Sequence, residues 1–243
     1  MRYDNFIKYY NEKDTVVFSD AISQYAYTLG AMPQILSRKK IEDKTGLFYE
    51  SSIFKLFEEA GYDTNYISYL KANNEGDDAI NFIVTESNHY YLYGPHGHNL
   101  SRIVSSAGMS SDFVNDMDIV PIIKQIINSS SKNKLIVIKM IGNHYNFEDR
   151  YPVEFDINQP SLMSEPGDYV KKNKGRIINT YNNSILYSIH VINSVLNILR
   201  ETKQSSLLVY SSDHGLNIFD NDVWLTAQVK ESYHLPLLWY ANH

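Results

Sequence analysis

Residues 206–215 read Ser-Leu-Leu-Val-Tyr-Ser-Ser-Asp-His-Gly. The apolar run 207–210 has the composition of a buried β-strand, and it stops at small polar residues and a glycine. In open α/β sheets, ligands bind just beyond the carboxyl ends of the strands, which places Asp213 and His214 at the rim of such a crevice. Adjacent carboxylate and imidazole groups suit a zinc ion, because both reach it from one stretch of backbone. A simple turn is the competing interpretation, since this composition is also common in turns.

Composition places the chain among ordinary globular proteins. Its 243 residues suffice for one large domain or two small ones, and 43% hydrophobic with 21% charged residues is typical of a folded chain. The formal net charge of -6 and the pI near 5.7 provide no basic stripe to neutralise phosphates, which excludes a nucleic-acid partner. Cysteine is absent, so disulfides and thiolate metal sites are excluded. The sequence has neither a run of about 18 apolar residues nor the apolar core of a signal peptide. We therefore expect neither a transmembrane segment nor a targeting segment in this chain.

Strand and helix patterns alternate along the sequence. Short apolar runs predict strands at 15–21, 66–70, 79–85, 134–140, 207–210 and 235–240. Helical spacing of apolar residues predicts helices at 27–37, 51–60, 118–128 and 181–199. This alternation predicts an α/β fold with a mostly parallel central sheet flanked by helices on both faces. Because no repeat or linker interrupts the chain, we expect a single domain over residues 1–243.

Thr28 stands where the first predicted helix begins. Threonine is a favourable N-cap residue, because its hydroxyl accepts a hydrogen bond from an amide of the first turn. The N-terminus of a helix also holds an anion such as phosphate well, so capping and anion binding both remain open for Thr28. Pro33 conflicts with a long regular helix and predicts a later start or a kink.

Several histidines follow predicted strands. His144 ends the sequence Ile-Gly-Asn-His that follows the strand 134–140. Parallel strands joined by helices would bring His144 to the same sheet edge as Asp213 and His214. His89, His96 and His98 also cluster in sequence, among Gly and Pro, and resemble a metal cluster. Their irregular spacing favours solvated loop histidines instead.

Four motifs in this order resemble those of the phosphoethanolamine transferases, which are lipopolysaccharide-modifying members of the alkaline phosphatase and sulfatase superfamily. They are Tyr-Thr-Leu-Gly-Ala-Met-Pro at 27–33, Gly-Asn-His at 142–144 through Asp-Arg-Tyr-Pro at 149–152, Tyr-Asn-Asn-Ser-Ile at 181–185 and Ser-Asp-His-Gly at 212–215. The resemblance extends from about residue 16 to residue 239. It implies an alkaline phosphatase/sulfatase-like fold and a location at the periplasmic face of the bacterial inner membrane, where the family's full-length members associate with the membrane.

The resemblance also assigns roles. Thr28, five residues before Pro33, matches the nucleophilic threonine, and it would contact Zn²⁺ together with Asp213 and His214. His144 matches the histidine that helps to bind the transferred phosphoryl group, although Asn143 replaces the family's serine. The implied donor is phosphatidylethanolamine, which passes its head group through a phosphothreonine-type intermediate to a lipopolysaccharide or glycan acceptor. In the mechanism that the resemblance implies, zinc would lower the pKa of the threonine hydroxyl, and His144 would stabilise charge on the phosphoryl oxygens.

Two departures from the family pattern affect the site. The family has a glutamate zinc ligand on a strand well upstream of the nucleophile, and no counterpart precedes Thr28. The family's later histidine is also absent from residues 217–233, and His234 is the nearest candidate for its substrate-binding role. With the missing membrane anchor, these departures indicate an N-terminally shortened relative. We expect weak zinc binding and little turnover from the isolated chain.

Two alternatives remain open. A phosphatase or sulfatase of the same superfamily would use water as the acceptor, although sulfatases usually have Cys or Ser where this chain has Thr28. A catalytically inactive remnant that binds a partner or a glycan is the alternative outside the enzymes, and the absent glutamate supports it.

Overall fold

The computed structural model describes residues 10, 14–40, 42, 50–68, 78–92, 115–129, 132–222, 224–225 and 229–242. The chain divides into two compact units, and each is described by itself. The first unit comprises residues 1–27 and 142–243, and the second comprises residues 28–141. The single domain expected over residues 1–243 stays a prediction.

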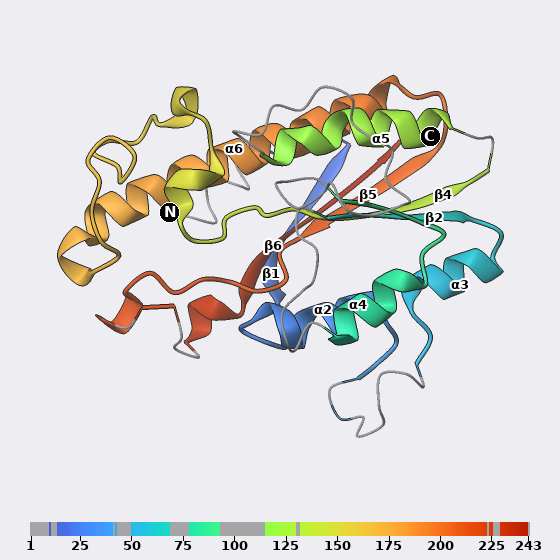
Figure 1. Cartoon of the computed structure of the whole chain (residues 1–243), viewed down its shortest axis with the longest axis horizontal. Helices are drawn as coiled ribbons and strands as arrows, with labels where there is room; N and C mark the ends of the chain where they lie inside the picture. Colours follow the sequence, from blue (N-terminus) through green and yellow to red (C-terminus); the bar gives the residue numbers. More distant parts are fainter. Residues whose placement is uncertain are drawn as a thin grey trace. The chain divides into compact units, whose positions relative to one another are not determined.

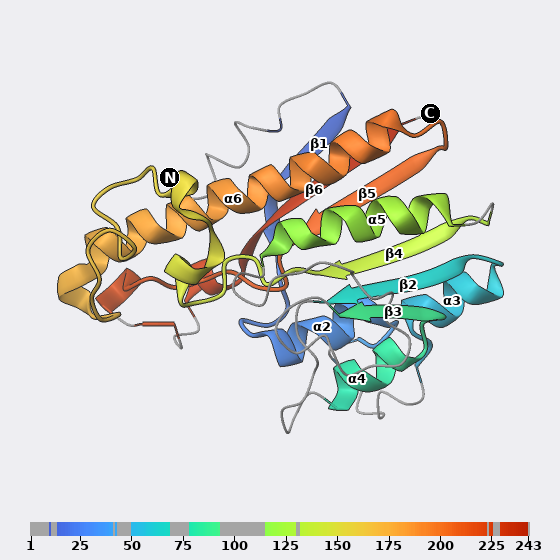
Figure 2. The same ribbon diagram turned by 45° about the horizontal axis from the view of Figure 1, so that its top comes forward.

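A parallel three-stranded sheet forms the centre of the second unit (Figure 2). Its strands are β2 (Asp63–Ser68), β3 (His89–Leu92) and β4 (Lys134–Lys139), and β2 lies between the other two. In the register, Tyr66 of β2 pairs with Tyr90 of β3 and with Val137 of β4. The central strand is almost completely buried, as parallel strands with helices on both faces usually are.

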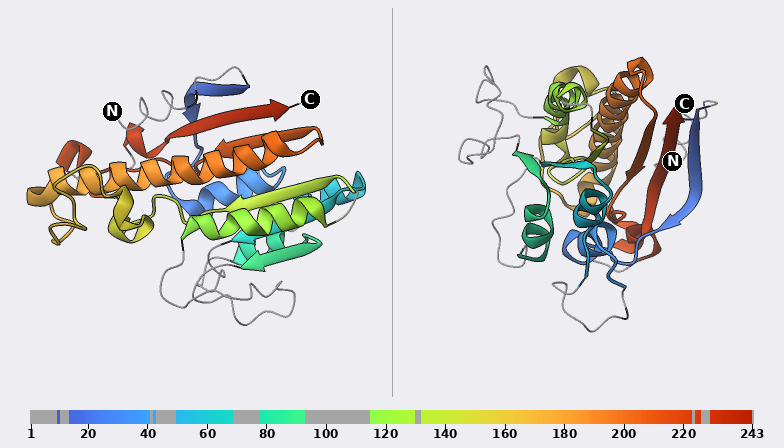
Figure 3. Two further views of the ribbon diagram at one scale, coloured as in Figure 1. Left: turned by 90° about the horizontal axis from the view of Figure 1, so that it is seen from above. Right: turned by 90° about the vertical axis from the view of Figure 1, so that its right-hand side faces the viewer.

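Helices cover both faces of this sheet. They are α2 (Thr28–Leu36), α3 (Ile53–Glu59), α4 (Asp78–Thr85) and α5 (Ile119–Asn128). Figures 1 and 3 show α5 on one face and the other three helices on the opposite face. The core between sheet and helices on the latter face includes Met32, Leu36, Phe54, Tyr66, Ile80, Ile83 and Val84. Each such side chain contributes about 1.5 to 3 kcal/mol of burial free energy.

The residues at the ends of α3 explain where it begins and stops, and the spacing of the isoleucines explains α5. Ser52 caps α3, because its hydroxyl accepts a hydrogen bond from the amide of Lys55 at 3.2 Å. The chain leaves this helix through Gly61, whose φ of +86° lies in the region that favours glycine. The isoleucines of α5 repeat at helical spacing, and Ile119, Ile123 and Ile126 are buried as that spacing predicts.

An antiparallel sheet and one long helix form the first unit. The strands are β1 (Thr15–Ile22), β5 (Ser206–Ser211) and β6 (His234–Asn242), with β6 between the other two. Trp239 of β6 pairs with Val16 of β1 and with Val209 of β5. The helix α6 (Lys174–Glu201) runs along one face of this sheet (Figure 2). Its stripe of Ile189, Ile192 and Leu196 packs with Tyr10, Leu238 and Tyr240.

Short 3-10 helices occupy several connections. They are η3 (Asp116–Asp118), η4 (Phe147–Arg150), η5 (Val153–Phe155), η6 (Lys171–Asn173), η7 (Asp220–Asp222) and η8 (Lys230–Ser232).

The α/β class is confirmed, and several details differ from the sequence predictions. The strands β1, β5 and β6, which were expected in the parallel sheet, pair antiparallel in a sheet of their own. The described residues between β5 and β6 form no crossover helix, and antiparallel neighbours need none. The run 79–85, predicted as a strand, is the helix α4, because Ile80, Ile83 and Val84 bury one helical face. The strand β5 is not buried on both faces, since Leu207 is 66% exposed and Val209 is 53% exposed.

In the part of the chain that the structure describes, no helix has the length and apolarity that crossing a membrane requires.

Candidate functional site

The loop that follows β5 places Asp213 and His214 side by side. The backbone amide of His214 donates to Asp213 Oδ1 at 3.0 Å, and His214 Nε2 lies 3.9 Å from Asp213 Oδ2. Both side chains are about one quarter exposed. The carboxylate and the imidazole therefore face each other at the surface of the first unit.

The hydrogen bond of the His214 ring determines which ring nitrogen can bind a metal ion. Its Nδ1 lies 2.6 Å from the carbonyl oxygen of Gly215. Because a carbonyl can only accept, Nδ1 must carry the hydrogen, and the lone pair of the neutral ring is on Nε2. A tetrahedral metal about 2.0 to 2.1 Å from two such ligands would hold them about 3.3 Å apart, slightly closer than the 3.9 Å observed. The arrangement fits two adjacent zinc ligands, and a backbone carbonyl that fixes the imidazole is the usual partner of such a ligand.

Gly215 allows this loop to approach the backbone that leads into β6. A Cβ atom at position 215 would lie 2.1 Å from the carbonyl oxygen of Glu231 and 2.4 Å from that of His234. The Gly215 amide donates to the carbonyl of Ser232 at 2.8 Å. The loop is thus held at this distance by a hydrogen bond that only glycine permits.

Ser23, just beyond β1, ties a third segment to the same place. Its hydroxyl donates to the carbonyl of Asp213 at 2.6 Å, and its amide donates to the carbonyl of Tyr233 at 2.8 Å. The carboxyl ends of β1 and β5 therefore meet the beginning of β6, which runs in the opposite direction. This contact orients the backbone of Asp213.

His234, the predicted substrate-binding histidine, is the first residue of β6. Its Nε2 lies 3.4 Å from Asp20 Oδ1, which is close enough for an ion pair when the ring is protonated. The geometry is not that of a hydrogen bond, because the same buried Nε2 has no hydrogen-bond partner among the described residues. His234 shares the first unit with Asp213 and His214, and its backbone carbonyl is close to Gly215.

His144 lies in a loop that follows Gly142, whose φ is +55°. The ring is exposed and stacks on Tyr145 with 4.9 Å between the ring centroids. Its Nδ1 donates to the carbonyl of Tyr145 at 2.5 Å, so the lone pair of the neutral ring is on Nε2, as in His214. A protonated His144 would have Nε2–H as a donor toward a phosphoryl oxygen.

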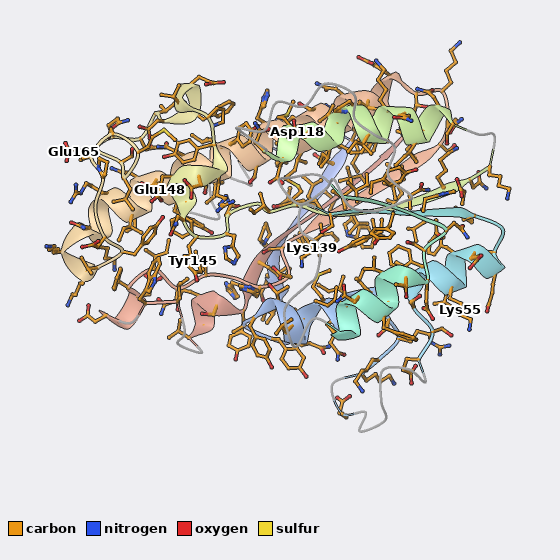
Figure 4. The ribbon with its side chains drawn as sticks, in the orientation of Figure 1. Lys55, Asp118, Lys139, Tyr145, Glu148 and Glu165 are labelled. Atoms are coloured by element: carbon orange, nitrogen blue, oxygen red, sulfur yellow. The ribbon has the colours of Figure 1, made fainter. Side chains whose placement is uncertain are left out.

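Contacts to two other elements hold this loop in place. Asn143 Nδ2 donates to Ser184 Oγ of α6 at 2.8 Å. The amide of Phe147 donates to the Tyr169 hydroxyl at 2.6 Å, and that hydroxyl donates to the carboxylate of Glu148. Burial, followed by the hydrogen bond to Glu148, raises the pKa of Tyr169 well above its usual range, so this side chain stays a neutral donor. Figure 4 labels Tyr145 and Glu148 in this loop.

Thr28, the predicted nucleophile, is the first residue of α2 in the second unit. It therefore occupies the first turn of the helix, where backbone amides can hold an anion, and the N-cap position falls one residue earlier than predicted. Pro33 lies inside this nine-residue helix and is buried, so it neither delays the start nor ends the helix. The proximity of Thr28 to Asp213 and His214 stays a prediction.

Among the residues that the structure describes, no three His, Cys, Asp or Glu side chains group closely enough to hold a metal ion. The predicted zinc set contains two such residues and the hydroxyl of Thr28. His89 does not lie in a loop as predicted but begins β3, and its Nε2 is 3.0 Å from Asp63 Oδ1. His96 and His98 lie outside the described residues.

Sequence reasoning missed the residues that support the site. Ser23 gave no signal, and Ser184 stood in the motif at 181–185 without an assigned role, because each acts on a residue far away in the sequence. Gly215 gave a partial signal, since glycine directly after Asp-His indicates either a turn or a close backbone approach. The distances show that the close approach is the reason for this glycine.

Comparisons with known proteins agree with this arrangement. The family model described as Sulfatase matches residues 5–243. Phosphoethanolamine transferase EptC of Escherichia coli (strain K12) is 24% identical over 247 residues, which cover 96% of this chain and 40% of that protein. The Kdo(2)-lipid A phosphoethanolamine 7''-transferase of the same strain is 31% identical over 110 residues, which cover 45% of this chain and 19% of that protein. The chain thus spans less than half the length of these curated relatives.

A solved structure has the same fold. The C-terminal periplasmic domain of EptC from Escherichia coli, in a complex with Zn, matches with a TM-score of 0.77 at 19% identity, covering 99% of this chain and 65% of that chain. This likeness confirms the alkaline phosphatase/sulfatase-like fold. The names of the relatives confirm the resemblance that the four motifs indicated.

Proposed function

The chain belongs to the sulfatase family, and from this premise we propose that it is a phosphoethanolamine transferase domain. The relatives that support this proposal carry that activity in their names. The observation that carries it is the pair formed by Asp213 and His214, whose Nε2 faces the carboxylate at 3.9 Å. The pair stands next to Gly215, where a Cβ atom would lie 2.1 Å from the carbonyl oxygen of Glu231.

The donor in this proposal is phosphatidylethanolamine. Thr28 Oγ attacks the phosphorus, a bond forms between them, and the bond from phosphorus to the diacylglycerol oxygen breaks. Diacylglycerol leaves with the proton that the threonine hydroxyl loses. A hydroxyl group of the acceptor then displaces Thr28 Oγ, which regains a proton.

The acceptor in this proposal is a lipopolysaccharide or another glycan. One relative is named for transfer to Kdo(2)-lipid A, which supports a lipid A type of acceptor. The matching structure is a periplasmic domain, and it supports a location at the periplasmic face of the inner membrane.

Zinc is the proposed cofactor, held by Asp213, His214 and Thr28. When bound, it would supply Lewis-acid chemistry that lowers the pKa of the threonine hydroxyl. The relative's structure in a complex with Zn supports this choice of metal. A protonated His144 would hold the phosphoryl oxygens through Nε2–H, and His234 is proposed to contact the substrate near Gly215.

A phosphatase or sulfatase that transfers to water is not favoured, because the curated relatives reported above carry transferase names. An inactive binding module is not favoured for the same reason.

The direct test is head-group release from a fluorescent phosphatidylethanolamine in the presence of zinc. Because the isolated chain is expected to turn over little, we expect slow release from the wild-type chain, loss of that release in Thr28→Ala, and partial recovery in Thr28→Ser, which keeps a hydroxyl group. His89→Ala is the matched control for loss of a histidine that has no role in the proposal. Equal release by the wild-type chain and Thr28→Ala would remove Thr28 from the mechanism.

Zinc content provides an independent test of the ligands. We expect protein purified without chelator to bind zinc, and Asp213→Asn and His214→Ala each to lose most of the affinity. Zinc binding that neither substitution changes would show that the metal site lies elsewhere.

A further inference from the structure

We infer that Asn143 is a positioning residue that holds the His144 loop on α6, and its importance for phosphoryl transfer rests on the proposed function. Asn143 directly precedes His144, at the position where the phosphoethanolamine transferases that this chain resembles have serine. Its side chain reaches across 41 positions of sequence to Ser184.

The hydrogen-bond geometry defines what Asn143 does. Ser184 is completely buried, and its hydroxyl donates to the carbonyl of Tyr181 at 2.8 Å. Its oxygen therefore accepts from Asn143 Nδ2 at 2.8 Å. One turn further along α6, the buried Ser188 donates to Asn143 Oδ1 at 3.5 Å, the outer limit for such a bond. The amide thus has a donor contact and an acceptor contact on the same helix face.

The other contacts of His144 lie within its own loop. Arg150 Nε donates to the carbonyls of His144 and Asn146, both at 3.1 Å, and the His144 ring bonds to the carbonyl of Tyr145. These bonds stiffen residues 144–150 but connect them only to one another. Asn143 connects the loop to the rest of the unit on one side. On the other side the connection is the Phe147–Tyr169 bond together with the buried Phe147 ring, which packs against Tyr181 of α6.

The direction of the His144 side chain depends on the bond between Asn143 and Ser184. If the bond between Asn143 and Ser184 is lost, the loop keeps its internal bonds but can pivot about the Phe147 end. A displacement of about 1 Å at a group that contacts the reacting phosphoryl is enough to lower the rate by about 100-fold. Asn143 is therefore expected to act on transfer only through His144.

Asn143→Asp is the sharpest test, because the two side chains have the same shape and the carboxylate lacks the donor. Ser184→Ala removes the acceptor from the other side. Ser194→Ala is the matched control, since Ser194 lies on the same helix and its hydroxyl donates to a carbonyl of its own helix at 3.0 Å. Thermal unfolding of every variant checks that the chain remains folded.

The first readout is hydrogen exchange of residues 144–150 in the full chain, which requires no activity. We expect exchange about fivefold faster or more in Asn143→Asp and Ser184→Ala, no further change in the double variant, and no change in Ser194→Ala. Unchanged exchange in both Asn143→Asp and Ser184→Ala overturns the proposal, whether or not the chain is a transferase.

The second readout is the rate of head-group release. We expect kcat/KM to fall by about 10-fold to 100-fold in Asn143→Asp, and Asn143→Asp to have no further effect in a His144→Ala background. Effects that add fully would show that Asn143 does not act through His144, which overturns its positioning role. A wild-type chain without any release contradicts the proposed function, and the exchange measurement then decides on Asn143 by itself.

Discussion

Replacing Gly215 with alanine should destabilise the loop that holds Asp213 and His214, although it adds only one methyl group. The new Cβ atom would lie 2.1 Å from the carbonyl oxygen of Glu231, whereas ordinary contacts begin at 3.4 Å. One of the two segments must therefore move by about 1.3 Å, the difference between these distances. Such a movement breaks the hydrogen bond from Gly215 to Ser232 and strains the bond from Ser23 to Tyr233. Overpacking together with the lost bond costs about 3 kcal/mol or more.

Thermal unfolding measures this cost. For a chain of this size, about 3 kcal/mol corresponds to a Tm lower by about 6 to 12 °C. Gly175→Ala is the matched control, because Gly175 lies in the first turn of α6 and a Cβ atom there meets nothing within 4 Å. That substitution should raise stability by about 0.5 to 1 kcal/mol, since alanine is the better helix former. If Gly215→Ala unfolds within 1 °C of the wild type, the close approach does not constrain the loop and our reasoning is wrong.

Three further predictions concern stability. Asn183→Ala should lower the free energy of unfolding in chemical denaturation by about 2 to 4 kcal/mol, because the buried amide of Asn183 bonds to Asn158 and Asp156. The control Asn182→Ala on the same helix should lower it by less than about 1 kcal/mol, since Asn182 Oδ1 has no hydrogen-bond partner among the described residues. Burial raises the pKa of Tyr151 to about 12, so between pH 10 and pH 12 the folded chain keeps a proton that the unfolded chain loses, and this residue should lower stability by up to about 1.4 kcal/mol per pH unit there. Burial raises the pKa of Tyr169 as well, so Tyr151→Phe should make the slope smaller and not abolish it, and an unchanged slope would contradict the assignment. Ser52→Ala should lower stability by about 1 kcal/mol through loss of the α3 cap, and a Tm equal to that of the wild type would show that the cap contributes nothing.

Local periodicity predicted most of the elements. The isoleucines of α5 and the stripe of α6 repeat at helical spacing, and both helices are present where that spacing placed them. The helix α6 begins at Lys174, earlier than the predicted residue 181, because its first turns are polar and only Ile177 and Thr180 are buried there. Polar turns carry little periodic signal, so the sequence could not locate this start.

Short apolar runs predicted secondary structure less well than helical spacing did. Residues 79–85 read equally well as a strand or as a helix, and packing of Ile80 and Ile83 into the core with Met32 and Phe54 decided in favour of the helix. The run 207–210 is a strand as predicted, but its exposed face could not be foreseen, because the direction of its partner β6 is a tertiary property.

The residues of the candidate site could also be predicted only in part. Asp213, His214 and His144 were found from their positions after predicted strands, which is local information. The groups that orient them, Ser184 through Asn143 and Ser23 through the carbonyl of Asp213, are 41 and 190 positions away from the residues they hold. Only the folded chain brings such pairs together, so no local pattern could indicate the pairing, although Ser184 lies in the motif at 181–185.

The identity of the nucleophile is the central claim, and intact-mass spectrometry followed by peptide sequencing tests it most directly. The zinc-loaded chain is incubated with phosphatidylethanolamine and no acceptor, so that even a slow reaction accumulates the covalent intermediate. We expect the mass of one phosphoethanolamine group added at Thr28, and no added mass in Thr28→Ala. Modification of a different residue, or an unmodified chain that nevertheless releases the head group, would contradict this claim.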